Sequence, residues 1–150
     1  MKCSGGAAFA AIALFAACGD DGHDGAGKPS QVDVSLVEFS VTATPDSVKA
    51  GKVLFNVRND GQAPVHELVV VRTDLTLAQL PRNPDGSFDE EGAGITVIGE
   101  IEEVPRNEAR TLMLDLESGH HVLLCNIVRI VNGQANSHFA AGMRTDFNVR

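Results

Sequence analysis

An all-β fold, a Greek-key sandwich or barrel of about seven or eight strands, is predicted for this chain of 150 residues. Short runs of Val, Leu, Ile and Phe alternate with polar residues, as expected for strands that face water on one side. Gly, Asn, Asp and Pro separate these runs and mark turns between the strands. Many short strands joined by such turns are typical of antiparallel sandwiches and barrels.

The strands can be placed one after another along the chain. The first alternates Val37, Phe39, Val41 and Ala43 with polar residues, and the third, "VHELVVVR", is apolar enough to be buried on both faces. The predicted strands cover residues 37–45, 52–61, 65–72, 95–104, 109–119, 120–127 and 142–150. Only residues 74–80, "DLTLAQL", suggest a short helix, which Asp74 would cap and Pro81 would end.

The N-terminal segment has the pattern of an export signal. Residues 1–17 carry a Lys at position 2 and continue in small apolar residues, too few for a permanent membrane span. The segment ends in "LFAAC", which resembles the bacterial lipobox, with Phe15 where that motif usually has Leu. The resemblance implies a lipid on Cys18 and an anchor on the periplasmic or cell-surface side of a membrane. An ordinary secretory signal and a soluble secreted protein is the alternative.

The composition of residues 18–150 separates a tether from a folded domain, and the charge of the chain excludes some functions. Residues 18–31 are rich in Gly and Asp and are predicted to form a flexible tether, which leaves residues 32–150 as one domain. The formal charge of −8 argues against nucleic-acid binding, which needs clustered Lys and Arg. It favours instead a partner with a basic docking face. No nucleophile elbow or catalytic acid–base pair is visible, so an enzyme is not expected.

One cysteine belongs to the predicted domain. Cys3 leaves with the signal and Cys18 would carry lipid, so Cys125 is left without a disulfide partner. A free thiol in an oxidising compartment must be deeply buried or bound to something. Cys125 could be a small core residue. Together with His66, His138 and Met143, however, it makes up the His₂Cys set with a weak thioether that characterises a type 1 copper site.

The order of these residues resembles the cupredoxin family over most of residues 32–150. "APVHELVVV" is similar to the family's first ligand strand, and "VLLCN" with "HFAAGMRTDFNV" is similar to its ligand loop and last strand. The resemblance implies one copper ion, bound strongly by His66, Cys125 and His138 and weakly by Met143. It implies a carrier of single electrons that meets redox proteins. Glu67 and Asn126 follow two of these residues and are expected to hold the site in place.

The chain departs from the family pattern by placing twelve residues between Cys125 and His138. Asn132-Gly133 is a strong hairpin signal within this insertion. A turn there pairs residue 131 with 134 and residue 127 with 138, which puts His138 on the same face as Cys125. The rival imidazoles, His120 and His121, are interpreted as surface residues or residues at the start of a strand.

Two other functions stay open at this point. The same ligands could serve copper handling without electron transfer, or zinc binding, since Cys and His also suit Zn²⁺. A metal-free sandwich acting as an interaction module is the second alternative, with Cys125 in its core.

Overall fold

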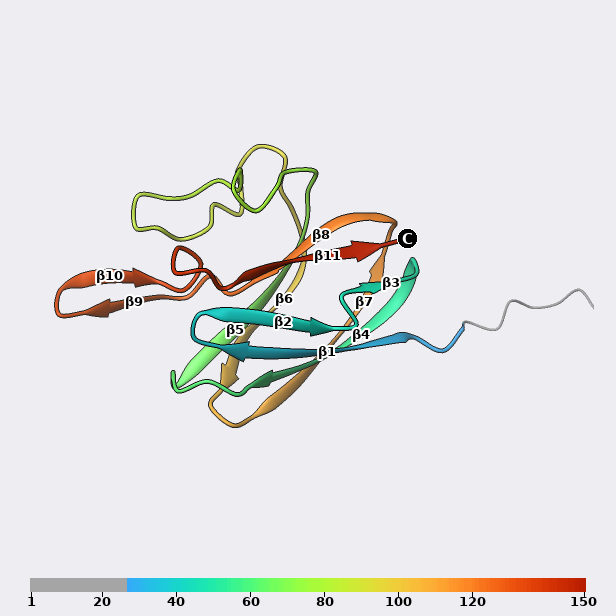
Figure 1. The fold of residues 1–150 in the computed structure, drawn as a ribbon, viewed down its shortest axis with the longest axis horizontal. Coiled ribbons are helices and arrows are strands. Elements are labelled where there is room, and N and C mark those ends of the chain that lie inside the picture. Colours follow the sequence, from blue (N-terminus) through green and yellow to red (C-terminus); the bar gives the residue numbers. More distant parts are fainter. Residues whose placement is uncertain (1–26) are drawn as a thin grey trace, which may run out of the picture.

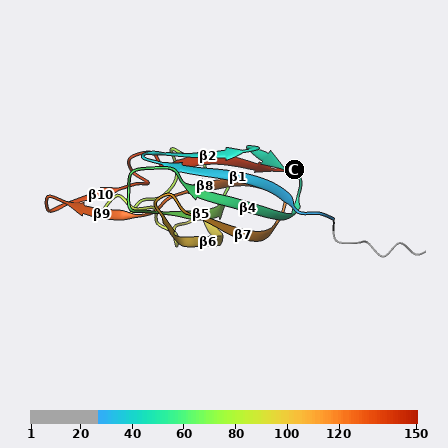
Figure 2. The same cartoon turned by 90° about the horizontal axis from the view of Figure 1, so that it is seen from below.

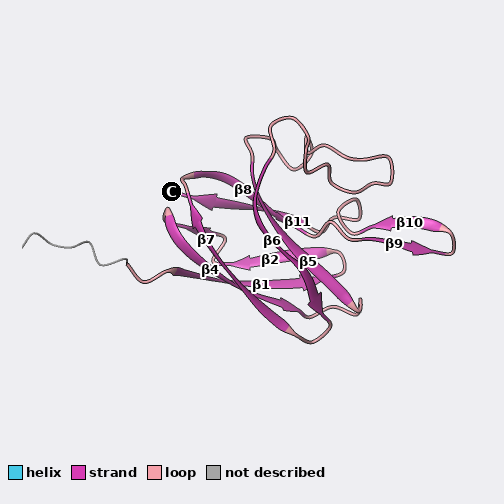
Figure 3. Cartoon of the chain, turned by 180° about the vertical axis from the view of Figure 1, so that it is seen from behind, coloured by secondary structure: helices cyan, strands magenta, loops and turns pink. Residues whose placement is uncertain are grey.

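The computed structural model describes residues 27–150, which form strands joined by turns and loops (Figure 3). The predicted signal peptide and the lipidation residue Cys18 lie outside these residues. The first strand begins at Ser30, two residues before the predicted start of the domain. Within the described part of the chain no helix is long and apolar enough to cross a membrane. The strands are β1 (Ser30–Val37), β2 (Ser40–Thr44), β3 (Ser47–Val48), β4 (Gly51–Asn59), β5 (Val65–Arg72), β6 (Thr96–Pro105), β7 (Ala109–Leu116), β8 (Gly119–Leu124), β9 (Val128–Val131), β10 (Gln134–Ser137) and β11 (Arg144–Val149).

The strands form a sandwich of two sheets, and a separate hairpin projects from one end (Figures 1 and 2). One sheet has the order β2-β1-β4-β7 and the other the order β3-β11-β8-β5-β6. Strands β9 and β10 pair only with each other. The predicted all-β sandwich is confirmed. Its sheets are mixed, because β1 runs parallel to β4 and β3 runs parallel to β11.

The main core lies between the two sheets. Val53, Phe55 and Val57 of β4 are fully buried there, as their alternation predicts. Phe55 packs against Phe147 of β11, with the ring centroids 5.6 Å apart. Burial of such side chains contributes roughly 1.5–3 kcal/mol each to stability.

A second, smaller core covers the outer face of β5 and β8. Leu68 and Val70 of β5 belong to the main core, whereas Val69 and Val71 belong to the second one. This two-sided burial explains the uninterrupted apolar run of β5. The covering layer is the long loop 73–95 between β5 and β6, whose Phe88 packs on Phe139 at a centroid distance of 5.2 Å.

The prediction of one strand over residues 37–45 was wrong. The chain turns at Glu38 and Phe39, so that β1 and β2 pair as a hairpin with Val37 opposite Ser40. The turn shifts the alternation, and Val37 and Phe39 are exposed instead of buried. The inward residues of β1 are Val32, Val34 and Leu36, a run that precedes the predicted strand.

The predicted helix at residues 74–80 is also absent. The backbone makes one turn, in which the N–H of Gln79 donates to the carbonyl of Thr76 at 2.9 Å. The Leu75 N–H donates to the hydroxyl of Thr73, the residue before the expected cap Asp74. Seven residues before a proline are too few to offset the cost of helix nucleation, and Leu80 is buried in the second core.

Candidate metal centre

The hairpin that interrupts the predicted ligand loop has the register expected from its turn. Val131 pairs with Gln134 around Asn132-Gly133, and both turn residues have positive φ, as a type I′ turn requires. At the base of the hairpin, the His138 N–H donates to the Ile127 carbonyl at 2.9 Å. The insertion therefore protrudes (Figure 1) and returns His138 to the face of Cys125.

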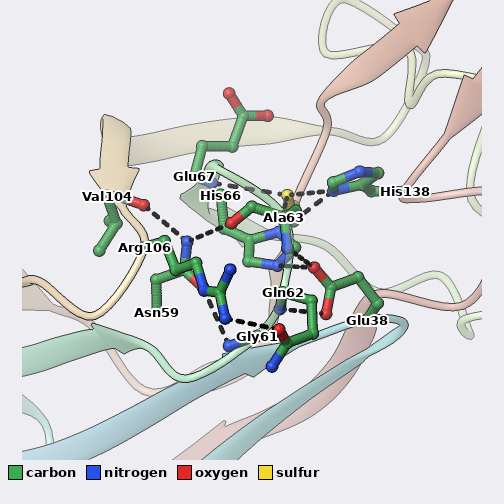
Figure 4. Close-up of polar contacts among 11 residues, drawn as sticks. Glu38, Asn59, Gly61, Gln62, Ala63, His66, Glu67, Val104, Arg106 and His138 are labelled. Carbon is green, nitrogen blue, oxygen red and sulfur yellow. Dashed lines mark hydrogen bonds and ion pairs between the residues drawn. The ribbon is translucent and has the colours of Figure 1, made fainter.

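Three side chains from separate parts of the fold converge on one point. His66 comes from the start of β5, Cys125 follows the end of β8, and His138 follows β10. His66 Nδ1 lies 3.2 Å from His138 Nδ1, and Cys125 Sγ lies 3.7 Å and 3.5 Å from these two nitrogens. Figure 4 shows the two imidazoles directed toward each other beside the sulfur atom.

This triangle of donor atoms has the dimensions of a metal site. A point equidistant from the three atoms lies about 2.0 Å from each, close to the lengths of metal–nitrogen and metal–sulfur bonds in proteins. Two imidazole nitrogens and a sulfur that face one another in the protein interior are the electron-pair donors of a cation site. Within residues 27–150 these three side chains form the one group of His, Cys, Asp and Glu residues with metal-binding spacing.

The site is closed to solvent and tied together by the backbone. His66 and Cys125 are fully buried, and His138 is 3% exposed. Met143, the fourth predicted ligand, is also fully buried, and its carbonyl accepts a hydrogen bond from the Cys125 N–H at 3.0 Å. The Met143 N–H donates to the His138 carbonyl at 3.0 Å. These bonds fix the loop that carries Cys125, His138 and Met143 as one unit.

Glu38, which the sequence did not single out, lies behind His66. Its Oε1 is 3.3 Å from His66 Nε2. The pair is near enough for an ion pair but poorly aligned for a hydrogen bond, and Nε2 is left buried without a hydrogen-bond partner. Coordination through Nδ1 requires the ring proton on Nε2, beside this carboxylate. Such carboxylate–histidine pairs orient the imidazoles of metal sites.

The Glu38 carboxylate is held by the turn before β5. The N–H of Gln62 donates to Oε2 at 2.9 Å, and the N–H of Ala63 donates to Oε1 (Figure 4). Burial alone would raise the pKa of Glu38, but these N–H groups, its own N–H and His66 outweigh burial and lower the pKa to about 2. Gly61 gives this contact its space, because a Cβ there would lie 2.6 Å from Glu38 Oε2.

Burial keeps the three donors uncharged when no metal is bound. Desolvation lowers the pKa of His66 and brings that of His138 to about 4, and Arg129 adds to both effects. Desolvation raises the pKa of the Cys125 thiol to about 11, against the hydrogen bonds from Glu67 and Ile127. Both imidazoles are therefore free to bind a metal at neutral pH, whereas the thiol must first lose its proton.

Glu67 and Asn126 brace the cysteine as expected. The Glu67 N–H points at Cys125 Sγ at 3.5 Å, and its carboxylate accepts a bond from the Asn126 N–H at 2.5 Å. The Asn126 side chain accepts from the Phe88 N–H and donates to the Phe88 carbonyl. Desolvation, with the nearby carboxylates of Glu90, Glu100 and Glu102, raises the pKa of Glu67 to about 7 despite the Asn126 bond.

The two other histidines of β8 lie away from the centre. His120 contacts the Thr73 carbonyl and Asp146, each at 2.8 Å, and is partly exposed. His121 is buried, which differs from its interpretation as a surface residue, and its Nδ1 is 3.2 Å from the Gly119 carbonyl. His121 lies on the same face of β8 as Leu123, which packs in the main core between the two sheets.

Comparison with known proteins places the fold. No protein-family model and no curated protein sequence matches the chain. Among solved structures, an auracyanin from Roseiflexus castenholzii is 16% identical, with a TM-score of 0.55 over 83% of this chain and 99% of its own. Rusticyanin from Thiobacillus ferrooxidans is 14% identical, with a TM-score of 0.57 over 83% and 79% of the two chains.

A third similar structure is auracyanin A, a "blue" copper protein from Chloroflexus aurantiacus. It is 16% identical, with a TM-score of 0.52 over 82% of this chain and 100% of its own. At this level of identity the likeness establishes the fold. The chain has the cupredoxin-like β-sandwich that its sequence resembles.

Proposed function

We propose that this chain is an exported copper protein that carries single electrons through a type 1 centre. The observation that carries the proposal is the closed, preformed triangle of His66, Cys125 and His138. The cupredoxin-like fold and the blue copper protein among the similar structures support it. His66, Cys125 and His138 would bind the ion strongly, and Met143 would bind it weakly.

Copper fits this set of donors better than zinc does. A thiolate and a thioether favour Cu(I), while imidazole also suits Cu(II), so one set serves both oxidation states. Structural zinc sites usually complete a tetrahedron with a fourth nitrogen, sulfur or oxygen ligand. Among the described residues no fourth His, Cys, Asp or Glu joins the cluster. Bound copper would supply a one-electron couple at this point.

The protein's own contribution is to hold the donor atoms in fixed positions and away from water. The backbone bonds that join Cys125, His138 and Met143 hold the ligand loop together, and the Cys125 and His138 donor atoms lie 3.5 Å apart without an ion. A site that needs little rearrangement between two oxidation states exchanges electrons with a low barrier. All three strong ligands are buried, so that a substrate or solvent water has no direct access to them, which favours electron transfer over catalysis.

The same burial favours electron transfer over copper handling. Passing an ion to another protein requires ligands that the recipient can reach, whereas His66 and Cys125 are fully buried. An electron needs only a short path to the surface. That path is present at His138, since its ring meets the half-exposed ring of Phe39 edge to face, at 5.7 Å between centroids.

The proposed setting is the outer side of a bacterial membrane. The lipobox-like "LFAAC" supports a lipid anchor at Cys18, and residues 18–31 would tether the domain at residues 32–150. The proposed partners are redox proteins of the same compartment.

Voltammetry of the copper-loaded chain tests the proposal. We expect one reversible one-electron wave, with copper retained through repeated oxidation and reduction. His138→Ala should abolish this wave, and His120→Ala, a matched change outside the centre, should leave it intact. Loss of the ion on reduction would instead identify a copper-handling protein.

A further inference from the structure

A second open space lies at the end of the sandwich opposite the metal centre. It is a pocket of about 710 Å³, a volume within the range of small-molecule sites. Its lining includes Arg72 at the end of β5 and His121 at the start of β8, which pair across the two strands. The ligands His66 and Cys125 lie at the other ends of the same strands. Arg72 is six positions after His66, about 20 Å along β5, so the pocket is distinct from the metal centre.

The most deeply buried polar side chain in this lining belongs to His121, which is 1% exposed. Its Nδ1 lies 3.2 Å from the Gly119 carbonyl. A carbonyl oxygen can only accept, so Nδ1 carries the ring proton and Nε2 presents a lone pair. Within residues 27–150 Nε2 has no hydrogen-bond partner, yet it is not enclosed, since His66 Nε2 is the one fully buried side-chain nitrogen or oxygen that lacks a partner there. His121 Nε2 is therefore an unused acceptor at the wall of the pocket.

The His121 ring is uncharged at neutral pH. Burial lowers its pKa, and Arg72 and His120 add to this effect, against the bond to the Gly119 carbonyl. A neutral ring that already donates through Nδ1 has only an acceptor left to offer. The ligand that completes this hydrogen bond must therefore bring a donor.

Charged side chains line the exposed part of the pocket, and acidic ones are in excess. They are the carboxylates of Asp74, Asp115 and Glu117 and the guanidinium of Arg72. Arg72 is already paired with Glu117, and Lys52 lies 3.7 Å from Asp115. Asp74 has no ion pair in the described part of the chain. Three carboxylates thus meet two cations, which leaves the charge of Asp74 uncompensated and disfavours an anionic ligand.

The remaining lining offers a surface for carbon atoms. It includes Ile95, Ile98 and Leu116, of which Leu116 is buried and the two isoleucines are partly buried. Contact with such side chains removes apolar surface from water and favours the alkyl part of a ligand. The pocket thus combines a buried acceptor, an apolar wall and an acidic opening.

We propose that this pocket binds a small protonated alkylamine. An ammonium N–H donates to His121 Nε2, and the carbon chain packs against Ile98 and Leu116. In a diamine, the second ammonium group lies near the carboxylate of Asp74. An ammonium group carries donors only, so it satisfies free acceptors and leaves no acceptor of its own unpaired. This binding needs neither copper nor the metal centre.

Three compounds with the same carbon chain and different charge test the proposal: 1,4-diaminobutane, 1,4-butanediol and succinate. Each is titrated into the full chain at constant ionic strength, while NMR follows the ring nitrogens of His121 and the backbone amides. The diamine should give a saturable shift of His121 Nε2. Butanediol should bind at least about tenfold more weakly, since it lacks the charge that Asp74 attracts, and succinate should leave the Nε2 shift unchanged.

Two matched variants separate the pocket from a general attraction of cations to a chain of net charge −8. Asp74→Asn should weaken diamine binding about tenfold and leave butanediol binding unchanged. Glu103→Gln removes one carboxylate from β6, outside the pocket, and should leave diamine binding within about twofold. Both side chains are exposed, so neither change disturbs the core.

Variants at His121 test the acceptor itself. His121→Phe keeps a buried ring without an acceptor and should abolish saturable binding of the diamine, whereas His121→Gln, whose amide oxygen accepts, should retain part of it. Undiminished binding to a folded His121→Phe chain would overturn the proposal. So would tighter binding of butanediol or succinate, no saturable binding of the diamine, or equal weakening by Asp74→Asn and Glu103→Gln. The last comparison holds even if the His121 variants fail to fold.

Discussion

Replacing Glu67 by Gln tests the electrostatics around the cysteine. Burial raises the pKa of Glu67 to about 7 from an ordinary value of 4.5. Between these pH values the folded, metal-free chain keeps a proton that the unfolded chain has lost. The free energy of unfolding therefore falls as pH rises through this window, and the loss is complete above about pH 7.

The size of the effect follows from the pKa. A difference of about 2.5 pKa units corresponds to about 3 kcal/mol at most, and the partial exposure of Glu67 reduces this to about 2 kcal/mol. Gln cannot ionise, and its carbonyl still accepts the hydrogen bond from the Asn126 N–H. The variant should therefore gain stability relative to the natural chain as pH rises from 5 to 8.5.

Urea denaturation of both metal-free chains across this pH range gives the difference directly. Glu103→Gln is the control, because Glu103 is exposed on the neighbouring strand β6. The stability change of this variant is subtracted from that of Glu67→Gln at each pH. A stability difference for Glu67→Gln that stays constant from pH 5 to 8.5 would refute the view that buried charge at Glu67 opposes folding.

Three further predictions concern the centre and its anchor. Zinc binding at pH 7 should release about one proton per ion, because the pKa of the Cys125 thiol is raised to about 11 while that of His138 is lowered to about 4. Calorimetry in buffers of different ionisation enthalpy counts these protons. Release of no proton would contradict a thiolate ligand. Gly61→Ala should lower the free energy of unfolding by about 1–3 kcal/mol and weaken metal binding, because the new Cβ would press on Glu38. Denaturation and metal titration measure the two effects. An unchanged stability and affinity would show that the contact of Gly61 with Glu38 does not matter. Cys18→Ser should move the protein from the membrane to the soluble fraction of cells, and continued membrane association would argue against a lipid on Cys18.

The sequence predicted most of the strands, and the gathering of His66, Cys125 and His138, for a physical reason. Residues with ligand chemistry are few in this chain, so their order along it carries much information. The Asn132-Gly133 turn fixes the register of the hairpin, and with it the face on which His138 lies. Local signals were sufficient wherever a strand is long and regularly alternating, as in β4.

Features set by distant contacts were not predictable. The turn at Glu38 and Phe39 contains no Gly, Asn or Pro, so the sequence gives no local sign of it. The contacts of Glu38 with His66 and of Phe39 with His138 depend on this turn and were therefore not predicted. The burial of His121 depends on Arg72 of β5 and Leu116 of β7, which are far away in sequence. The close approach of Gly61 to Glu38 likewise appears only in three dimensions.

The visible absorption spectrum of the chain after addition of Cu(II) tests the central claim most directly. A thiolate bound to Cu(II) absorbs visible light intensely, so the Cys125 site should give a blue or green protein that ascorbate bleaches. Cys125→Ser should be colourless, and Cys3→Ser should keep the colour. A colourless natural chain, or colour that survives Cys125→Ser, would contradict the assignment of Cys125 as a copper ligand.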